Sequence, residues 1–427
     1  MKFGSTLSAD AFPSREFDFM LSNPPYGKSW KTDLDRLGGK KDIRDPRFVI
    51  EHGGDAEFSL ITRSSDGQMV FLANMLSKMK KASPLGSRIA EVHNGSSLFT
   101  GDAGSGESNV RRWVIENDWL EAIIALPLNI FYNTNLATYI WVVSNRKAAS
   151  RKGILQLIDA TTWFKPLRKN LGKKNCELGS EDIKRITDAF LNMEETEYSK
   201  LFRNEAFGYR KITVERPLRV KVDLAPVMLT RFRKACVDSG EEALIGPVEK
   251  VAAKLGKGPH YDFNQFFKTV GGAADSDGVR MTAKRQKLLM TELGIRDAGA
   301  AKVIKKTAKP KAGADAEKDA LFGIYHETIG SQRVTVEYES DPDLRDTEQV
   351  PFLEAGGIEA FLLQEVLSHA PDAWVDRSKT VIGYEISFAR HFYKPQPLRT
   401  LHEIEADIRA LEKETEGLLD DVLVRAH

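Results

Sequence analysis

The sequence predicts an α/β fold in the N-terminal part of the chain, followed by a mainly helical C-terminal region. Three observations lead to this prediction. Short apolar stretches alternate with amphipathic stretches up to about residue 160. From residue 181 to about residue 295 the pattern is mainly helical. The chain has 427 residues, which is too long for one ordinary domain. We therefore expect a parallel or mixed sheet first and separate units after it.

Five apolar stretches read as strands, because each is a short run bounded by turn residues. They are Phe17 to Leu21, Arg88 to Val92, Trp119 to Leu126, Thr138 to Val143 and Ile154 to Ile158. Two stretches between them, Met69 to Lys81 and Glu107 to Glu116, read as helices, and the first carries a stripe of Met and Leu side chains. We expect this stripe to lie in the core and the sheet to end near residue 160.

Composition divides the chain into four parts, of which residues 1–160 are the first. Residues 161–296 are mainly helical, apart from a strand-like stretch at Gly208 to Leu218. Residues 297–320 are rich in Ala and Lys and have few large apolar side chains, which predicts a flexible linker. Residues 321–427 show β character up to Glu339, then a helix at Gly357 to Leu367 and a terminal helix over 400–424.

The terminal helix has the clearest pattern in the chain. Its apolar residues follow alternating spacings of three and four, interrupted only by one threonine, as in a coiled-coil seam flanked by charges: Leu401, Ile404, Ile408, Leu411, Thr415, Leu418 and Val422. Two interpretations stay open. The helix docks on its own domain, or it pairs with a helix of a partner subunit.

The composition argues against several classes of protein. No apolar run approaches the roughly 18 residues of a membrane span, and the N-terminal residues do not resemble a signal peptide. The two cysteines are far apart and the eight histidines lack ligand spacing, so we expect no metal and a reducing cytoplasm. The formal net charge is +1, so any binding to nucleic acid must come from a local patch.

One such patch lies between Asn145 and Lys174. It holds nine basic residues and one acid, with Trp163 and Phe164 among them: Arg146, Lys147, Arg151, Lys152, Lys165, Arg168, Lys169, Lys173 and Lys174 against Asp159. Basic residues interleaved with aromatic ones suit phosphate contacts and base stacking. A solvated loop is the equally weighted alternative.

A glycine-rich stretch, Gly101-x-x-Gly104-x-Gly106, is the one candidate for a phosphate-binding loop. It follows a loop and not a clear strand, and no acidic residue closes a following strand about twenty residues on. We therefore interpret it as a flexible surface loop.

The stretch Asn23-Pro24-Pro25-Tyr26 ends the first predicted strand abruptly. Its two prolines donate no N–H, so the backbone there cannot continue a ladder of hydrogen bonds. An Asn amide, backbone carbonyls and an aromatic ring remain at the strand end, and this set suits a planar amine held by acceptors and stacked on a ring. An ordinary strand-ending turn is the alternative.

Together with this turn, several stretches resemble the modification (M) subunit of type I restriction–modification systems, a family of adenine-N6 DNA methyltransferases. They occur in the order of the family along essentially the whole chain: Thr6 to Phe12, His93 to Gly101, Gly106 to Arg111, Leu126-Pro127, Phe131 to Thr134, Thr138 to Val142, Ile158 to Ala160, Arg168 to Gly172, Gly383 to Ile386 and Phe392-Tyr393. One departure is Asn135, where relatives usually carry Gly.

The resemblance implies a Rossmann-like methyltransferase sheet and methyl transfer from S-adenosylmethionine to the N6 of an adenine flipped out of double-stranded DNA. Asn23, Pro24, Pro25 and Tyr26 would form the catalytic turn. Tyr26 would stack on the base, and Phe131 is a weaker candidate for its other face. The basic residues Lys165, Arg168, Lys169, Lys173 and Lys174 would bind DNA. The implied partners are a specificity subunit, a second M subunit and a restriction subunit.

A larger departure concerns the cofactor. In the family, a glycine-rich loop and an acidic residue hold S-adenosylmethionine many tens of residues before the catalytic turn, whereas only 22 residues precede Asn23. We therefore expect the C-terminal portion of an M subunit without its cofactor-binding front half. Two alternatives stay open: an inactive remnant or split half that binds DNA or a partner, and a methyltransferase for another planar amine such as a glutamine side chain.

Overall fold

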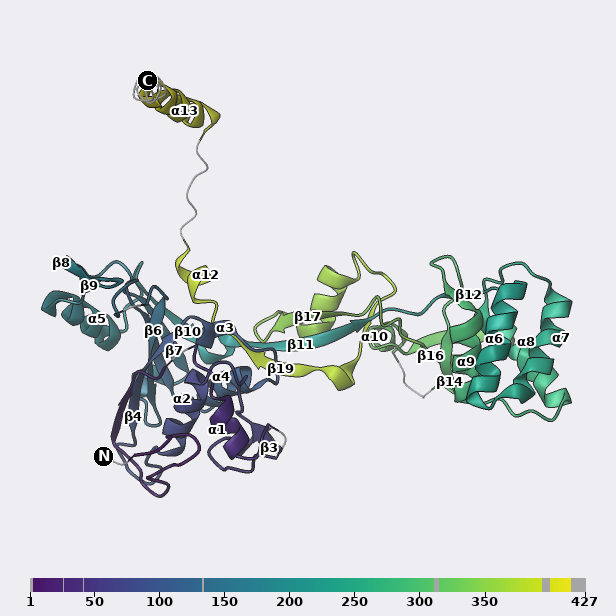
Figure 1. Ribbon diagram of the computed structural model, residues 1–427, viewed down its shortest axis with the longest axis horizontal. Helices are drawn as coiled ribbons and strands as arrows, with labels where there is room; N and C mark the ends of the chain where they lie inside the picture. The colour runs from purple at the N-terminus through teal and green to yellow at the C-terminus, as the bar shows by residue number, and fades with distance from the viewer. Residues whose placement is uncertain are drawn as a thin grey trace, which may run out of the picture.

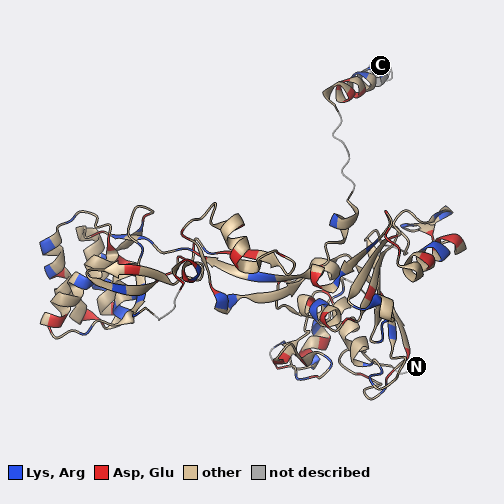
Figure 2. Ribbon diagram, turned by 180° about the vertical axis from the view of Figure 1, so that it is seen from behind, with Lys and Arg blue, Asp and Glu red and all other residues tan. Residues whose placement is uncertain are grey.

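The computed structural model describes residues 3–25, 27–40, 42–132, 134–310, 315–393 and 400–415. Figure 1 shows an elongated molecule, with an α/β part at one end, a narrow middle part and a group of helices at the other end. Acidic and basic residues are both found in every part of the molecule (Figure 2), in keeping with the net charge of +1. No helix among the described residues is both long and apolar enough to cross a membrane.

The N-terminal part contains a mixed six-stranded sheet in the order β1-β4-β6-β5-β7-β10. Its strands are β1 (Phe19–Ser22), β4 (Arg88–Asn94), β5 (Leu120–Ala125), β6 (Thr138–Ser144), β7 (Ile154–Asp159) and β10 (Ser199–Arg203). The pairs β1–β4 and β5–β7 are parallel, and the other neighbours are antiparallel. The predicted α/β class and the five predicted strands are confirmed.

The prediction that the sheet ends near residue 160 was wrong, because β10 pairs antiparallel with β7. The residues of β10 do not alternate regularly between apolar and polar, so the sequence pattern assigned them to a helical region. The strand is recruited by tertiary pairing, and Ser199 at its start is buried beside Gln156, whose side-chain amide donates to the Ser199 hydroxyl.

Helices cover both faces of this sheet. The helices α2 (Gln68–Ser77) and α4 (Gly106–Glu116) pack on one face, where Ile89, Ile123 and Trp141 are buried. The helix α5 (Ser180–Asn192) packs on the other face, against Ile124 and Ile158. The predicted Met/Leu stripe is confirmed as core, since Met69, Leu72, Leu76 and Met79 are at most 2% exposed.

The polar segment between the Asn-Pro-Pro turn and residue 55 is more ordered than its composition suggests. It forms α1 (Lys31–Arg36) and the hairpin β2 (Val49–His52) and β3 (Asp55–Ser59). A few large apolar side chains hold it on the core, namely Trp30, Leu34, Ile43 and Phe48, all buried. Scattered singly among charges, they leave no periodic signal in the sequence.

The glycine-rich stretch also differs from its interpretation as a flexible surface loop. Gly106 begins α4, and a Cβ there would lie 2.1 Å from the backbone oxygen of Ile61. This glycine therefore allows two segments of backbone to approach closely.

The middle part is built on β11 (Gly208–Glu215), which pairs with β17 (Asp346–Pro351), β18 (Trp374–Val375) and β19 (Val381–Tyr384). The strand-like stretch predicted at 208–218 is thereby confirmed. Beyond it, a helical unit has its own apolar core and consists of α6 (Pro226–Ser239), α7 (Ile245–Leu255), α8 (Phe263–Ser276), α9 (Ala283–Leu293) and the pair β12 (Val220–Val222) and β13 (Gly294–Arg296).

The predicted linker over 297–320 was partly wrong. Ala300 and Val303 are buried, and β14 (Ile304–Ala308) pairs with β16 (Gln332–Tyr338), which also pairs with β15 (Tyr325–Ile329). The short helix α10 (Ala316–Ala320) follows, while residues 311–314 lie outside the described residues. The β character predicted for Leu321 to Glu339 is confirmed.

The helix predicted at Gly357 to Leu367 is confirmed as α11 (Gly357–Phe361) and a π-helical turn at Leu362–Val366. Two further short helices are α3 (Ser96–Phe99) and α12 (Phe388–Phe392), and 3₁₀ turns lie at Ala149–Arg151, Asn204–Phe207, Glu242–Leu244 and Arg377–Lys379.

The terminal helix is confirmed over α13 (Leu401–Thr415), whose seam residues Leu401, Ile404 and Ile408 are exposed. Residues 416–427, with Leu418 and Val422, lie outside the described residues, so its pairing with a partner stays a prediction.

Arg111 ties the C-terminal part of the chain to the sheet domain. This α4 side chain is fully buried and donates hydrogen bonds to the backbone oxygens of Ser97 (2.9 Å), Thr100 (2.9 Å) and Tyr384 (2.6 Å). Burial lowers the pKa of the guanidinium to about 10. Since Tyr384 ends β19, one cation holds the loop after β4 and the middle part of the molecule together.

Strand β1 forms one edge of the sheet among the described residues. Met20 faces the core, whereas Phe19 and Leu21 on the opposite face are 77% and 85% exposed. An unpaired edge strand with exposed apolar side chains favours pairing with another chain.

We expect Leu21→Lys to reduce concentration-dependent self-association, because a charge on an edge strand disfavours strand addition. Light scattering coupled to size-exclusion chromatography measures this. The control Leu191→Lys places the same charge on a 66% exposed leucine of α5 and should have no effect. A wild-type chain that stays monomeric at high concentration contradicts the expectation.

We expect Arg111→Met to destabilise the protein by about 3–5 kcal/mol, because three buried carbonyl oxygens lose their donor. Urea denaturation measures the free energy of unfolding. The neighbouring Arg112→Met removes a partly exposed pair with Glu116 and should cost about 1 kcal/mol or less. Equal losses in the two variants would count against the role of Arg111.

Candidate functional site

The Asn-Pro-Pro turn lies at the carboxyl end of β1. Ser22, the last residue of the strand, pairs with Glu91 of β4, and the two prolines that follow Asn23 end the ladder. Asn23 and Pro25 are exposed and Pro24 is buried, while Tyr26 lies outside the described residues. Within the part of the chain that the structure describes, no hydrogen bond engages the Asn23 amide. This amide is therefore free to accept and donate toward a ligand.

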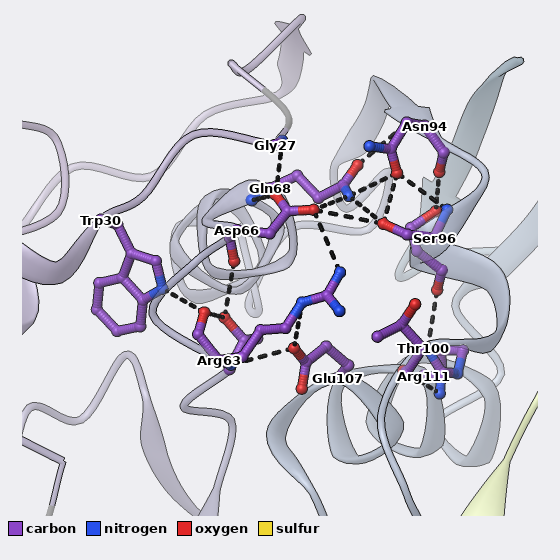
Figure 3. A network of polar contacts seen from close by, with 12 residues as sticks. Gly27, Trp30, Arg63, Asp66, Gln68, Asn94, Ser96, Thr100, Glu107 and Arg111 are labelled. Carbon is purple, nitrogen blue, oxygen red and sulfur yellow. Dashed lines mark hydrogen bonds and ion pairs between the residues drawn. The ribbon is translucent and has the colours of Figure 1, made fainter. Parts of the chain in front are cut away.

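The residue after the turn is held by a buried carboxylate (Figure 3). The Gly27 N–H donates to Asp66 Oδ1 at 3.1 Å, and Asp66 is only 7% exposed. Gly27 has a φ of +70°, a left-handed conformation that glycine adopts without steric cost. The turn is thus fixed at both ends, by the β1–β4 ladder and by Asp66.

Gln68, the first residue of α2, connects Asp66 to the carboxyl end of β4. Its amide nitrogen lies 2.8 Å from Asp66 Oδ2 and 2.8 Å from Asn94 Oδ1. Its amide oxygen accepts the Asn94 N–H at 3.0 Å, and Ser96 Oγ lies 2.9 Å from the Gln68 nitrogen. The ends of two parallel strands and the start of one helix therefore share a single polar network.

Arg63 lies at the outer side of this network. Its backbone N–H donates to Glu107 Oε1 at 3.1 Å, and its guanidinium lies 3.6 Å from Glu107 and 3.7 Å from Asp66. Its side chain is 45% exposed, and its backbone oxygen accepts the Trp30 indole N–H at 2.9 Å. Arg63 is thus an accessible cation at the edge of this network.

Sequence reasoning missed Asp66, Gln68, Arg63 and Trp30. Asp66 and Gly67 stand just before a helix, where an acidic residue is an ordinary start signal. Asn94 and Ser96 fall in the stretch His93 to Gly101, so the resemblance marked that loop without indicating its contacts. Nothing in the chain order indicates that Asp66 reaches back to Gly27.

The N-terminal segment is held on α2 by a second charged cluster. Asp10 Oδ2 lies 2.6 Å from Lys78 Nζ, and Arg47 donates to the backbone oxygens of Thr6 (3.1 Å) and Leu7 (2.7 Å). Burial opposes ionisation of Asp10, but hydrogen bonds from Lys78 and the Phe12 N–H outweigh it and lower the pKa of this carboxyl. A hollow of about 370 Å³ lies between this segment and β1.

The predicted DNA-binding residues lie on a hairpin formed by β8 (Lys165–Leu171) and β9 (Lys174–Glu177). Lys165, Arg168, Lys169 and Lys173 are exposed, and Lys174 is partly exposed. Phe164, which precedes the hairpin, is 42% exposed. A basic, exposed hairpin beside an accessible aromatic ring suits contacts to nucleic acid.

Part of the predicted basic patch was wrong, because three of its members are used inside the protein. Lys147 is buried and pairs with Asp118 at 2.6 Å. Arg151 is buried and donates to the backbone oxygen of Phe190. Trp163 is 5% exposed and packs edge-on against Tyr198, so it cannot stack on a base.

The loop after β5 lies between the sheet and the hairpin. Phe131 is partly buried and packs against the cluster that contains Ile130, while Asn133 lies outside the described residues. A hollow of about 630 Å³ opens beside this loop, lined by Leu126, Leu128, Asn129, Tyr139, Phe164 and Asn175 among others. Burial and the nearby charge of Asp159 raise the pKa of Tyr139. Whether Phe131 faces the same base as Asn23 stays a prediction.

The glycine-rich stretch does not fit a loop that holds S-adenosylmethionine. Gly106 approaches the backbone of Ile61 and Thr62, and Gly104 faces Val381, so this glycine-rich segment packs on the protein and cradles no ligand. The described residues likewise contain no group of three or more His, Cys, Asp or Glu side chains that could hold a metal ion. Among the described residues, the groups that the turn exposes toward a ligand are the hydrogen-bonding atoms of the Asn23 amide.

The sequence profile of the N-6 DNA Methylase family matches residues 1–210. The chain is 30% identical over 188 residues to the Type I restriction enzyme MjaIX methylase subunit of Methanocaldococcus jannaschii, an alignment that covers 44% of this chain and 30% of that protein. It is 27% identical over 181 residues to the MpnII methylase subunit of Mycoplasma pneumoniae, covering 42% of this chain and 28% of that relative.

A type I restriction-modification methyltransferase subunit of Streptococcus thermophilus aligns in structure with a TM-score of 0.37 and 25% identity, over 47% of this chain and 38% of that one. The chain spans about 30% of the length of the MjaIX relative. Residues 1–210 therefore resemble the N-6 DNA methylase family, and the chain is similar to the methylase subunits of type I restriction enzymes.

Proposed function

We propose that this chain supplies the base-holding part of an adenine-specific N6 DNA methyltransferase, the modification subunit of a type I restriction–modification system. The observation that carries the proposal is the Asn-Pro-Pro turn. It lies at the carboxyl end of a parallel strand, its Asn23 amide is exposed, and both of its ends are anchored. In open α/β sheets this edge is where ligands bind.

The chemistry follows from the groups at the turn. The Asn23 side-chain oxygen and the Pro24 carbonyl accept the two hydrogens of the adenine amine, which directs the nitrogen lone pair away from them. Tyr26 stacks on the base after it leaves the duplex, and Phe131 is the candidate for its other face. The turn acts by positioning the amine and supporting the charge that develops on it.

The methyl donor that the family implies is S-adenosylmethionine, and the glycine-rich stretch forms no loop that would hold it. The proposal is therefore confined to the acceptor side of the reaction. The basic hairpin, with Arg168 and Lys169 at its most exposed part, contacts the phosphates of double-stranded DNA.

The partners follow from the relatives, which are named as subunits of type I restriction enzymes. A specificity subunit would read the DNA sequence, a second modification subunit would complete the methylase, and a restriction subunit would join the full complex. The exposed seam of α13 is the surface proposed for pairing with a partner helix. The cytoplasm, where DNA is accessible, is the proposed compartment.

A second candidate function is that of a binding chain without independent transferase activity. The exposed edge at Phe19 and Leu21 and the packing of the glycine-rich segment favour it. Calorimetric titration of the chain with S-adenosylmethionine separates the two candidates, because tight binding by this chain alone would eliminate the second.

We expect Asn23→Ala to abolish N6-methylation of adenine, because the amine loses the acceptor that orients it. Mapping N6-methyladenine across the chromosome of the source organism, with the substitution at the native locus, tests this in the complete assembly. The expected result is loss of at least about 100-fold in methylation at one DNA sequence motif, the size of effect seen when a group that stabilises developing charge is removed.

The matched control is Asn192→Ala, an exposed asparagine at the end of α5. It should leave the methylation pattern unchanged. If the pattern is also unchanged in Asn23→Ala, the turn does not hold the acceptor base and the proposal fails.

We expect the triple substitution of Arg168, Lys169 and Lys173 to Ala to weaken DNA binding and to flatten its salt dependence. A plot of the logarithm of the DNA-association constant against log[salt] has a negative slope, and each lost phosphate contact reduces its magnitude by about 0.9. Fluorescence anisotropy with duplex DNA between low and moderate salt measures both effects. The charge-matched control replaces Lys254, Lys257 and Lys268, which are exposed on the helical unit. An unchanged slope in the hairpin variant would remove the hairpin from the DNA interface.

A further inference from the structure

We infer that Asp66 is a positioning residue for the catalytic turn, and that it acts through the Gly27 N–H and through Gln68. This inference rests on the proposed function, since it concerns how the acceptor base would be held. Asp66 does not itself reach the base. Its role is to fix the backbone on which Asn23 and Pro24 are presented.

The Asp66 carboxylate accepts hydrogen bonds at both of its oxygens. Oδ1 accepts the backbone N–H of Gly27 (3.1 Å) and of Gln68 (3.3 Å). Oδ2 accepts from the Gln68 side-chain amide (2.8 Å), and the Ser96 hydroxyl lies 3.3 Å from Oδ2 but 2.6 Å from Asn94 Oδ1. Figure 3 shows the carboxylate between these groups, with the turn on one side and the end of β4 on the other. Both oxygens must be acceptors, so the site requires a carboxylate and not an amide.

The turn is short between its two anchors. The ladder fixes Ser22 against Glu91, and Asp66 fixes Gly27. Two of the residues between them are prolines, whose rings set φ and so reduce the number of free backbone rotations. We therefore expect a displacement of Gly27 to shift Asn23.

The second contact of Asp66 links the turn to the neighbouring strand. Gln68 is 2% exposed, and its amide lies between Asp66 and Asn94, the last residue of β4. Its oxygen accepts the backbone N–H of Asn94. The ends of β1 and β4 are thus held in register by side chains beyond the point where the backbone ladder stops. Such support is what keeps a binding group within a fraction of an ångström of its working position.

The substitution Asp66→Asn tests this directly, because it keeps the size of the side chain. One oxygen becomes an NH₂ group that faces the donor of Gln68, so two donors oppose each other at a distance of 2.8 Å. The double variant Asp66→Asn with Gln68→Glu reverses donor and acceptor across this contact, while the Gln68→Glu change also turns an oxygen toward Asn94 Oδ1. It should therefore restore part of what the single variant loses.

The matched control is Asp118→Asn at the opposite end of the same sheet. Asp118 also accepts a glycine N–H, from Gly153 at 3.0 Å, together with Asn204 (2.9 Å) and Lys147 (2.6 Å). Like Asp66, it accepts a glycine N–H and side-chain donors, but it makes no contact with the turn. It controls for a general loss of stability.

Hydrogen–deuterium exchange of the purified full chain, followed in peptides that cover residues 22–30, is the first measurement. In Asp66→Asn we expect exchange at these amides to accelerate at least about tenfold, with α4 unaffected. The double variant should return toward the wild-type rate, and Asp118→Asn should leave the turn unchanged. Unaltered exchange at the turn in Asp66→Asn, or equal acceleration throughout the chain, would overturn the inference.

Chromosomal N6-methyladenine mapping is the second measurement, and it separates the two proposals. We expect Asp66→Asn to lower methylation at the target motif by about tenfold and the double variant to recover part of it. If Asp66→Asn accelerates exchange at the turn but leaves methylation undiminished, Asp66 has a structural role only and the inference is wrong. If the wild-type chromosome shows no methylation that depends on Asn23, the proposed function fails, whereas the exchange result still decides whether Asp66 positions the turn.

Discussion

The parallel pairing of β1 with β4 is the constraint on which the candidate site depends. Parallel strands bring their carboxyl ends to the same edge of a sheet, so the turn after Ser22 and the loop after Asn94 necessarily lie side by side. The network of Asp66, Gln68 and Asn94 then extends this alignment beyond the backbone ladder. Arg111 in turn donates hydrogen bonds to the backbone oxygen of Ser97 in the loop after β4 and to that of Tyr384 at the end of β19. The turn is therefore supported from the core outward.

The same sheet bears on the proposal that this chain supplies only the acceptor side of the reaction. Its β1 edge carries exposed Phe19 and Leu21, and its glycine-rich segment packs on protein backbone. The two features on which the proposed function rests are the Asn-Pro-Pro turn at the sheet end and the basic hairpin. Both suit the binding of DNA and the presentation of a planar amine.

The basic residues of the patch serve two different purposes, because some are bonded inside the protein and others are exposed. Two basic residues of the patch, Lys147 and Arg151, are buried and bonded within the protein, where their loss would leave carbonyl and carboxylate groups unpaired. Those on β8 and its turn are exposed and available to phosphates. A basic stretch in a sequence does not distinguish these two uses, because burial depends on which segment packs against it.

The sequence by itself determined the α/β class, five strands of the sheet, the core stripe of α2, the terminal helix and the Asn-Pro-Pro turn, because each is a local pattern of apolar spacing or of proline chemistry. Only the tertiary structure decided that β10 joins the sheet, that β14 lies in an ordered sheet, and that Trp30 and Phe48 anchor a polar segment. It also decided that Asp66 reaches back 39 positions to Gly27. Contacts of this kind are set by the pairing of distant segments, and no local pattern encodes them.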